Sequence, residues 1–252
     1  MFQPSSEAGG AAAGARQHLD ALLDSAALPE LPPGFADAVQ HYVALLLSAN
    51  ARLNLTRVVE PEAVARLHIL DALSALPILD ELAPASAVDL GSGGGVPGIP
   101  LALARPDVRW TLVDSVGKKA RALRGFVRAL ALRNVEVVAE RAEIIGRAAA
   151  HRERYDFVAA RACAPIPVLA ELALPLLRTG GRLLAWKGPL TDADDEIHRG
   201  RAAAGQLGGG ELEIRPSLTE LGGHTFVVVP KVRPTPARFP RRPGDPARRP
   251  LS

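Results

Sequence analysis

A glycine-rich run between two apolar segments constrains this chain more than any other feature. The run reads Asp89-Leu90-Gly91-Ser92-Gly93-Gly94-Gly95-Val96-Pro97-Gly98. It follows a short apolar segment and precedes residues 99–104, which have helical character. The pattern predicts a strand, a glycine turn and a helix. Glycines at such a turn let a ligand approach bare backbone, and a helix N-terminus favours a carboxylate or phosphate there. We therefore expect a nucleoside-containing cofactor at this turn.

Two acids indicate which cofactor this is. The spacing of Gly93, Gly95 and Gly98 matches the dinucleotide fingerprint, which is a weak signal by itself. Asp89, at the end of the predicted first strand, would repel a pyrophosphate and attract the ammonium of S-adenosylmethionine, directly or through water. Asp114 ends the next apolar run 25 residues later, where an acid commonly binds ribose hydroxyls. The pair favours an S-adenosylmethionine-dependent methyltransferase over an NAD(P)-dependent oxidoreductase or an ordinary glycine turn with a capping Asp.

Composition limits the remaining classes of protein. A chain of 252 residues that is 48% hydrophobic can hold one α/β domain with additions. It has no apolar run of about 18 residues, so no membrane span is expected. No secretory signal is visible either. The single cysteine, Cys163, excludes an internal disulfide and a multi-cysteine metal site. These features predict a cytoplasmic protein without a metal, and we expect a monomer.

The charge is distributed unevenly along the chain. Residues 231–252 hold seven basic residues and one acid, a net charge of +6, whereas the remaining 230 residues carry −3. A cationic, proline-rich tail on a slightly acidic body suits a polyanionic partner such as RNA. The alternative is a solvated, disordered tail.

The order of patterns predicts four segments. Residues 1–14 are expected to be disordered, residues 15–82 to form a helical extension, residues 83–230 a methyltransferase domain, and residues 231–252 the basic tail. Within the domain, apolar runs predict strands at 86–90, 110–113, 135–139, 157–160, 182–186, 212–215 and 226–229. Helices are predicted at 97–104, 118–130, 142–149 and 168–177, and a flexible loop at 200–210. This alternation indicates a doubly wound, mostly parallel sheet with an antiparallel final strand.

Taken together, these motifs resemble the bacterial guanine-N7 methyltransferases of 16S ribosomal RNA, the glucose-inhibited division protein B family. The resemblance covers roughly residues 35–252. The matching pieces, besides the glycine run, are Asn54-Leu55-Thr56, His68-Ile69-Leu70-Asp71, Asp114-Ser115-Val116-Gly117-Lys118-Lys119, Arg141-Ala142-Glu143, Arg161-Ala162 and Trp186-Lys187-Gly188. The resemblance implies an α/β, Rossmann-like S-adenosylmethionine-dependent fold with a helical N-terminal extension. It also implies 16S rRNA or the small ribosomal subunit as the partner.

The resemblance also implies roles for single residues. The implied or predicted cofactor-binding residues are Asp89, Gly91, Gly93, Val96, Asp114, Ala142, Glu143 and Arg161. Lys187 is implied to face the RNA, and Lys187 and Arg161 are expected to position the base rather than move a proton. The chain departs from the family pattern at Leu67 and His224, where basic residues are common, and at Cys163, which replaces an aromatic residue.

The expected chemistry needs little from the protein besides alignment. Guanine N7 is an exposed acceptor with a free lone pair and no proton, so its attack on a sulfonium methyl requires no general base. His68 and Asp71 lie three apart on one helical face and belong either to the ligand-binding surface or to a packed helix contact. We expect Cys163 to be a buried small hydrophobe rather than a nucleophile, and Asn54 to be a turn or cap residue. A non-catalytic RNA-binding protein remains the other alternative.

Overall fold

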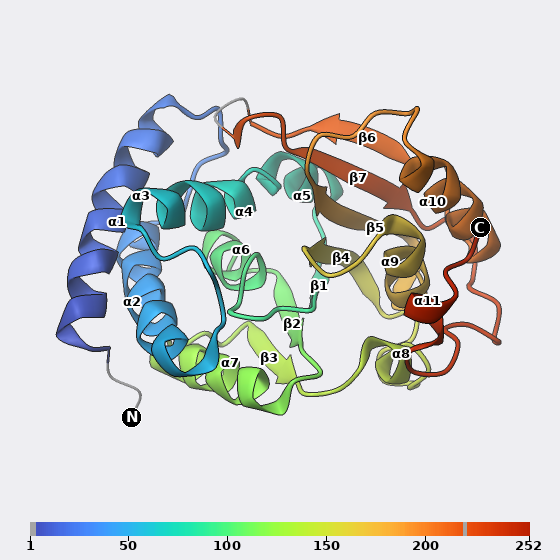
Figure 1. The fold of residues 1–252 in the computed structure, drawn as a ribbon, viewed down its shortest axis with the longest axis horizontal. Helices are drawn as coiled ribbons and strands as arrows, with labels where there is room; N and C mark the ends of the chain where they lie inside the picture. Colours follow the sequence, from blue (N-terminus) through green and yellow to red (C-terminus); the bar gives the residue numbers. More distant parts are fainter. Residues whose placement is uncertain (1–3, 219–220) are drawn as a thin grey trace.

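A seven-stranded sheet in the order β3-β2-β1-β4-β5-β7-β6 lies at the centre of the molecule (Figure 1). The computed structural model describes residues 4–218 and 221–252. The strands are β1 Ser86–Leu90, β2 Arg109–Val113, β3 Val135–Val138, β4 Tyr155–Arg161, β5 Leu177–Lys187, β6 Glu213–Pro216 and β7 Thr225–Pro230. The first five are parallel, and β7 is antiparallel to both of its neighbours. The predicted doubly wound sheet with an antiparallel last strand is confirmed.

Helices cover both faces of the sheet because its central strands are apolar on both sides. In β4, Phe157 and Ala159 join one core, while Val158 and Ala160 join the other, as the two-residue period of a strand requires. The first core lies under α2 Phe35–Leu53, α6 Gly98–Ala104 and α7 Gly117–Ala129; the second lies under α9 Ile166–Ala173 and α10 Asp195–Gln206. This arrangement brings the carboxyl ends of β1, β2 and β4 to one edge, where ligands bind in such sheets.

The N-terminal extension is helical from its first described residues. Helix α1 Ser6–Ser25 begins at the N-cap Ser5, whose hydroxyl accepts from the Ala8 amide. Its alanines favour helix and, with Leu19, form the buried face: Ala8, Ala12, Ala15 and Leu19. The prediction of disorder is therefore wrong for residues 6–14, because small residues at helical spacing were read as low complexity; residues 1–3 lie outside the described residues.

A series of short helices connects this extension to the sheet. They are α3 Pro61–Val64, the π-helical turn η1 Ala65–Leu70, α4 Asp71–Leu73 and α5 Leu76–Leu82. The first three follow one another without a break, and η1 carries His68. No helix in the described ranges is long and apolar enough to cross a bilayer.

The loop predicted at residues 200–210 is mostly helix. Helix α10 continues to Gln206, and Gly200 sits where it packs on α9: a Cβ there would lie 2.5 Å from Cγ2 of Ile166. That prediction is wrong because a glycine needed for close packing was read as a sign of flexibility.

The basic tail packs against the domain. Phe239 and Lys231 are buried, and a short helix, α11 Asp245–Arg248, lies beside α9 (Figure 1). Arg241 pairs with the buried carboxylate of Glu171 at 2.5 Å. Arg152 donates to the carbonyls of Thr235 and Phe239, both at 2.8 Å. These contacts hold the tail against the domain, so the alternative of a solvated, disordered tail is wrong.

Candidate active site

The predicted glycine turn joins the ends of β1 and β2. The amides of Gly91 and Ser92 both donate to the carbonyl of Val113 at 2.9 Å. Asp114 completes the junction: its carboxylate accepts from the Gly93 amide at 2.9 Å and from the Val116 amide at 2.8 Å. The two loops therefore share one carboxylate, which is 7% exposed and lies at the wall of a cavity.

Asp89 is buried at this turn and lines neither of the two cavities described below. It is 1% exposed, and its Oδ2 accepts from the amide of Gly98 at 3.1 Å. A Cβ at Gly98 would lie only 2.6 Å from that oxygen, so the turn requires glycine there. Burial raises the pKa of Asp89 to about 7. In this structure the Asp89 carboxyl shapes the turn, and its predicted interaction with the cofactor, directly or through water, stays a prediction.

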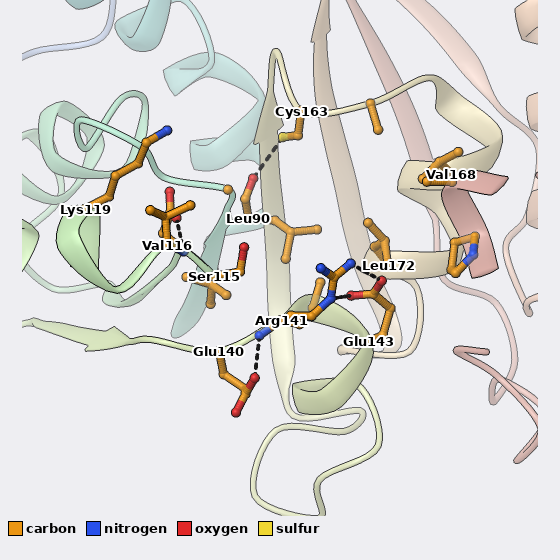
Figure 2. A pocket seen from close by; sticks show the side chains of 17 residues that line it. Leu90, Ser115, Val116, Lys119, Glu140, Arg141, Glu143, Cys163, Val168 and Leu172 are labelled. Carbon is orange, nitrogen blue, oxygen red and sulfur yellow. Dashed lines mark hydrogen bonds and ion pairs between the residues drawn. The ribbon is translucent and has the colours of Figure 1, made fainter. Parts of the chain in front are cut away.

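A cavity of about 370 Å³ opens at the carboxyl edge of the sheet (Figure 2). Four residues of the predicted site line it: Gly91, Asp114, Ala142 and Glu143. Figure 2 shows Ser115 and Val116 on one side and Arg141 and Glu143 on the other. Val168 and Leu172 of α9 add an apolar wall. Apolar walls with a few fixed polar groups are typical of small-molecule sites.

The basic tail forms part of this cavity, which the sequence analysis did not predict. Pro246 and Ala247 line it, and the amide of Gly244 donates to Oε1 of Glu143 at 2.8 Å. Arg141 donates to the same oxygen at 2.8 Å. Burial works against the charge of Glu143, but these hydrogen bonds outweigh it and lower the pKa of the carboxyl. Glu143 therefore fastens the tail at the rim of the cavity.

A second cavity, of about 260 Å³, lies on the other side of the glycine turn. Gly91 lines both cavities, and the predicted residues Gly93, Val96 and Arg161 line this second one. Gly91 has φ +79°, and a Cβ there would approach Sγ of Cys163 at 3.2 Å. Bare backbone at Gly91 therefore separates the two cavities.

Asp71 and Arg161 form a buried ion pair behind the second cavity. Nε of Arg161 lies 2.8 Å from Oδ2 of Asp71, and Nη2 of Arg161 donates to the carbonyl of Leu67 at 2.6 Å. Nδ1 of His224 lies 3.1 Å from Oδ1 of Asp71. Asp71 is 1% exposed, so for this residue the packed-contact interpretation is confirmed. The pair fixes the orientation of Arg161 at the cavity wall.

His68 is buried yet also lines the second cavity. Its Nε2 lies 2.7 Å from Oγ1 of Thr56, and its Nδ1 lies 3.2 Å from the carbonyl of Leu67. Burial, reinforced by the nearby Arg161 charge, lowers the pKa of His68 to about 4. The ring is neutral near pH 7. Because a carbonyl can only accept, Nδ1 carries the proton, and the Thr56 hydroxyl donates to Nε2.

The sequence matches the family model for rRNA small subunit methyltransferase G, GidB, over residues 36–219. The chain belongs to this family. It is 46% identical over 211 residues to ribosomal RNA small subunit methyltransferase G of Roseiflexus sp. (strain RS-1), covering 83% of this chain and 89% of that protein. Its identity to the Deinococcus radiodurans protein of the same name is 45%, covering 83% of both chains.

Solved structures support the fold. The CurJ carbon methyltransferase matches with a TM-score of 0.54 at 14% identity, covering 90% of this chain and 68% of that one. The S-adenosylmethionine-dependent methyltransferase SibL matches with a TM-score of 0.53 at 17% identity, covering 87% and 70%. The Rossmann-like methyltransferase fold implied by the sequence is therefore confirmed for this member of the rRNA methyltransferase G family.

Lys187 lies outside both cavities. Its Nζ pairs with Glu196 at 2.5 Å and donates to the carbonyl of Ala164 at 3.2 Å. The expected role beside the base is corrected, because the carboxylate on α10 already holds this ammonium. Sequence reasoning did not find Glu196, since α10 was not predicted.

Two minor predictions have opposite outcomes. Asn54 ends α2 in the left-handed conformation with its amide bonded to the carbonyl of Asn50, so its cap role is confirmed. Cys163 is exposed at the wall of the larger cavity, so the prediction of a buried hydrophobe is wrong. Its sulfur nevertheless packs against the Leu90 carbonyl at 3.0 Å. Local desolvation and the Asp89 carboxyl raise the pKa of the Cys163 thiol to about 12, which disfavours the nucleophilic thiolate.

Proposed function

We propose that this chain transfers the methyl group of S-adenosylmethionine to N7 of a guanosine in 16S rRNA of the small ribosomal subunit. The observation that carries the proposal is the pair of cavities that meet at Gly91. One cavity has the groups that suit an adenosine, and the other is free of carboxylates among its lining residues. Membership of the rRNA methyltransferase G family supports the same reaction.

The larger cavity fits the nucleoside part of S-adenosylmethionine. Asp114 supplies a carboxylate that can accept from two ribose hydroxyls, and Ala142, Val168 and Leu172 supply apolar surface for a base. Gly91 lets the sulfonium end pass between the cavities, because any side chain there would meet Cys163. When bound, the cofactor supplies an electrophilic methyl group.

The second cavity suits a base whose reacting atom carries no proton. Its polar side chains include Thr56, the neutral His68 and the fixed guanidinium of Arg161. Guanine N7 needs no general base, so alignment and exclusion of water can supply the catalysis. A reaction at an amino or hydroxyl group would call for a base. None of these three side chains is a carboxylate, and His68, with a pKa of about 4 and its Nε2 bound by Thr56, is a poor base.

Arg161 is suited to hold one edge of the guanine without blocking N7. Its Nε donates to Asp71 and one N–H of Nη2 donates to the Leu67 carbonyl, which leaves the two N–H groups of Nη1 and one of Nη2. A guanidinium fork on both O6 and N7 would cover the nucleophile. A single donor to O6 leaves the N7 lone pair open. We therefore propose that Arg161, rather than Lys187, positions the base.

The test separates three outcomes. Calorimetry is run with S-adenosylmethionine, S-adenosylhomocysteine and NADH, and labelled S-adenosylmethionine is then supplied with unmodified 16S rRNA and with small subunits. We expect binding of the first two ligands and transfer of label to RNA. Binding of NADH alone would favour the oxidoreductase. RNA binding without transfer of label, on either substrate, would favour the non-catalytic alternative.

A further inference from the structure

Among the residues that the structure describes, helix α7 carries more cations without a side-chain partner than the C-terminal tail does. Between Asp114 and Glu136 the sequence has six basic residues and no acid, a net charge of +6 equal to that of the tail. The six are Lys118, Lys119, Arg121, Arg124, Arg128 and Arg133. Five of them lie on α7 itself.

Four of these cations lie on one face of the helix. Lys118, Arg121, Arg124 and Arg128 are all exposed. At 3.6 residues per turn they fall within about 120° of arc and extend about 15 Å along the axis. The opposite face, with Leu123 and Phe126, is buried against the domain. Figure 1 shows α7 along one edge of the molecule.

The charges on this face are not neutralised by the protein. None of the four makes an ion pair with any residue in the described ranges; only Arg124 has a side-chain contact, to the Val137 carbonyl at 3.2 Å. The mutual repulsion of these charges raises the free energy of the folded protein unless an anionic partner or counterions offset it.

The tail differs because its charges are largely used within the fold. Lys231 is 1% exposed and pairs with Glu153, and Arg241 pairs with Glu171. Arg248 pairs with Asp245, and Arg238 lies over the ring of Phe239. Arg233 also donates to the Gly205 carbonyl, which leaves Arg242 and Arg249 as the tail cations without a side-chain partner in the described ranges. Between Asp114 and Glu136, five of the six cations have none, since Arg124 alone bonds to a carbonyl.

We infer that the exposed cationic face of α7, defined by Lys118, Arg121, Arg124 and Arg128, docks the phosphate backbone of the substrate RNA. The inference rests on the proposed function, which supplies the RNA. Helix α7 starts directly after Val116, whose amide binds the same Asp114 carboxylate as the amide of Gly93, and Gly93 lines the second cavity. RNA lying along the helix would therefore reach the edge of the cavity proposed for the base. Arginines and lysines on a helix contact phosphates without reading bases.

Two matched double variants test the inference. The first is Arg121→Ala, Arg128→Ala; the second is Arg242→Ala, Arg249→Ala, which removes the same charge from exposed tail positions that have no side-chain partner in the described ranges. RNA affinity is measured against salt concentration, with affinity for S-adenosylmethionine as a folding control. Each lost phosphate contact makes the log–log salt slope shallower by about 0.7–0.9.

We expect the α7 variant to lose about tenfold or more in RNA affinity and to have a salt slope about 1.5 shallower. Its KM for RNA should rise while kcat and cofactor affinity stay unchanged, and the tail variant should resemble the wild type. An unchanged slope in the α7 variant, or a slope lost only in the tail variant, would overturn the inference. Failure of the proposed function is a separate result: the wild-type protein would then bind RNA without transferring a methyl group.

Discussion

At the scale of single residues, Asp114 combines two tasks. Its carboxylate ties the amides of Gly93 and Val116 together and also lines the larger cavity. The sequence could predict the position, since an acid after the second strand is a local pattern. It could not predict that Asp114 links the two loops by hydrogen bonds, because these bonds depend on how the loops meet in space.

We predict that Asp114→Ala weakens binding of S-adenosylmethionine and S-adenosylhomocysteine by about tenfold or more, because a hydrogen bond to a charged group contributes about 1.5–3 kcal/mol. Calorimetry measures the loss. Asp114→Asn keeps a carbonyl acceptor and should lose less than Asp114→Ala. Equal affinity of wild type and Asp114→Ala would remove Asp114 from the cofactor site.

Asp89 shows the limit of reading one residue from its neighbours in sequence. Its place after a strand suggested a ligand, whereas the structure buries it under the turn with the Gly98 amide as partner. A carboxyl with a pKa of about 7 in the fold and about 3.9 in the unfolded chain keeps its proton longer when folded. Its contribution to stability is therefore greatest at low pH and falls as the pH rises from about 4 to 7.

The variant Asp89→Asn makes this testable. Asn retains an acceptor for Gly98 but does not titrate. We predict that the free energy of unfolding of Asp89→Asn, minus that of the wild type, increases between about pH 4 and pH 7 by up to about 4 kcal/mol and is flat above pH 7. Denaturant titrations at several pH values measure it. A difference that stays constant across this range would show that Asp89 does not titrate as described.

At the scale of elements, the local patterns predicted most of the strands and missed packing between distant segments. The strand at residues 86–90 was placed correctly, because an apolar run followed by glycines is visible in sequence. The start of β5 at Leu177 was missed, since it depends on pairing with Tyr155. Residues 6–14 of helix α1 and the whole of helix α10 were missed for a common reason: small residues that allow close packing resemble those of flexible segments.

The basic tail is the segment whose role in the structure differs most from the prediction. Its charge suggested an RNA-binding arm, whereas in the structure Gly244 binds Glu143, and Pro246 and Ala247 line the larger cavity. Charge alone cannot show whether a cation has a partner. The apolar Phe239 within the basic stretch was the available signal that this segment packs.

We predict that deleting residues 242–252 lowers the affinity for S-adenosylmethionine by about tenfold or more, because it removes one wall of the cavity and the amide partner of Glu143. The retained Arg241 still pairs with Glu171, so part of the tail stays anchored. Since a truncation can disturb folding, Ala247→Phe serves as a second variant, with Arg242→Ala as its control. If both the truncation and Ala247→Phe bind the cofactor like the wild type, the tail is not part of the site.

At the scale of the whole molecule, the sheet brings together what the sequence spreads over most of the chain. The second cavity draws Thr56 from the N-terminal extension, the glycine turn from β1 and Arg161 from β4. The larger cavity adds Asp114, Glu143 and the tail. The family resemblance could name these residues one by one. The sequence could not show that they line two cavities on either side of Gly91. That arrangement depends on how four segments, distant in sequence, pack together in space.

The most direct test of the central claim is to identify the methylated atom. Unmodified small subunits are incubated with the protein and S-adenosylmethionine, and the 16S rRNA is digested to nucleosides and analysed by mass spectrometry against standards of each methylguanosine. We predict 7-methylguanosine at a single position, formed by the wild type and lost when S-adenosylmethionine is omitted. A methyl group on an exocyclic amine, on a ribose or on a pyrimidine would contradict the account, because those reactions place different demands on the second cavity.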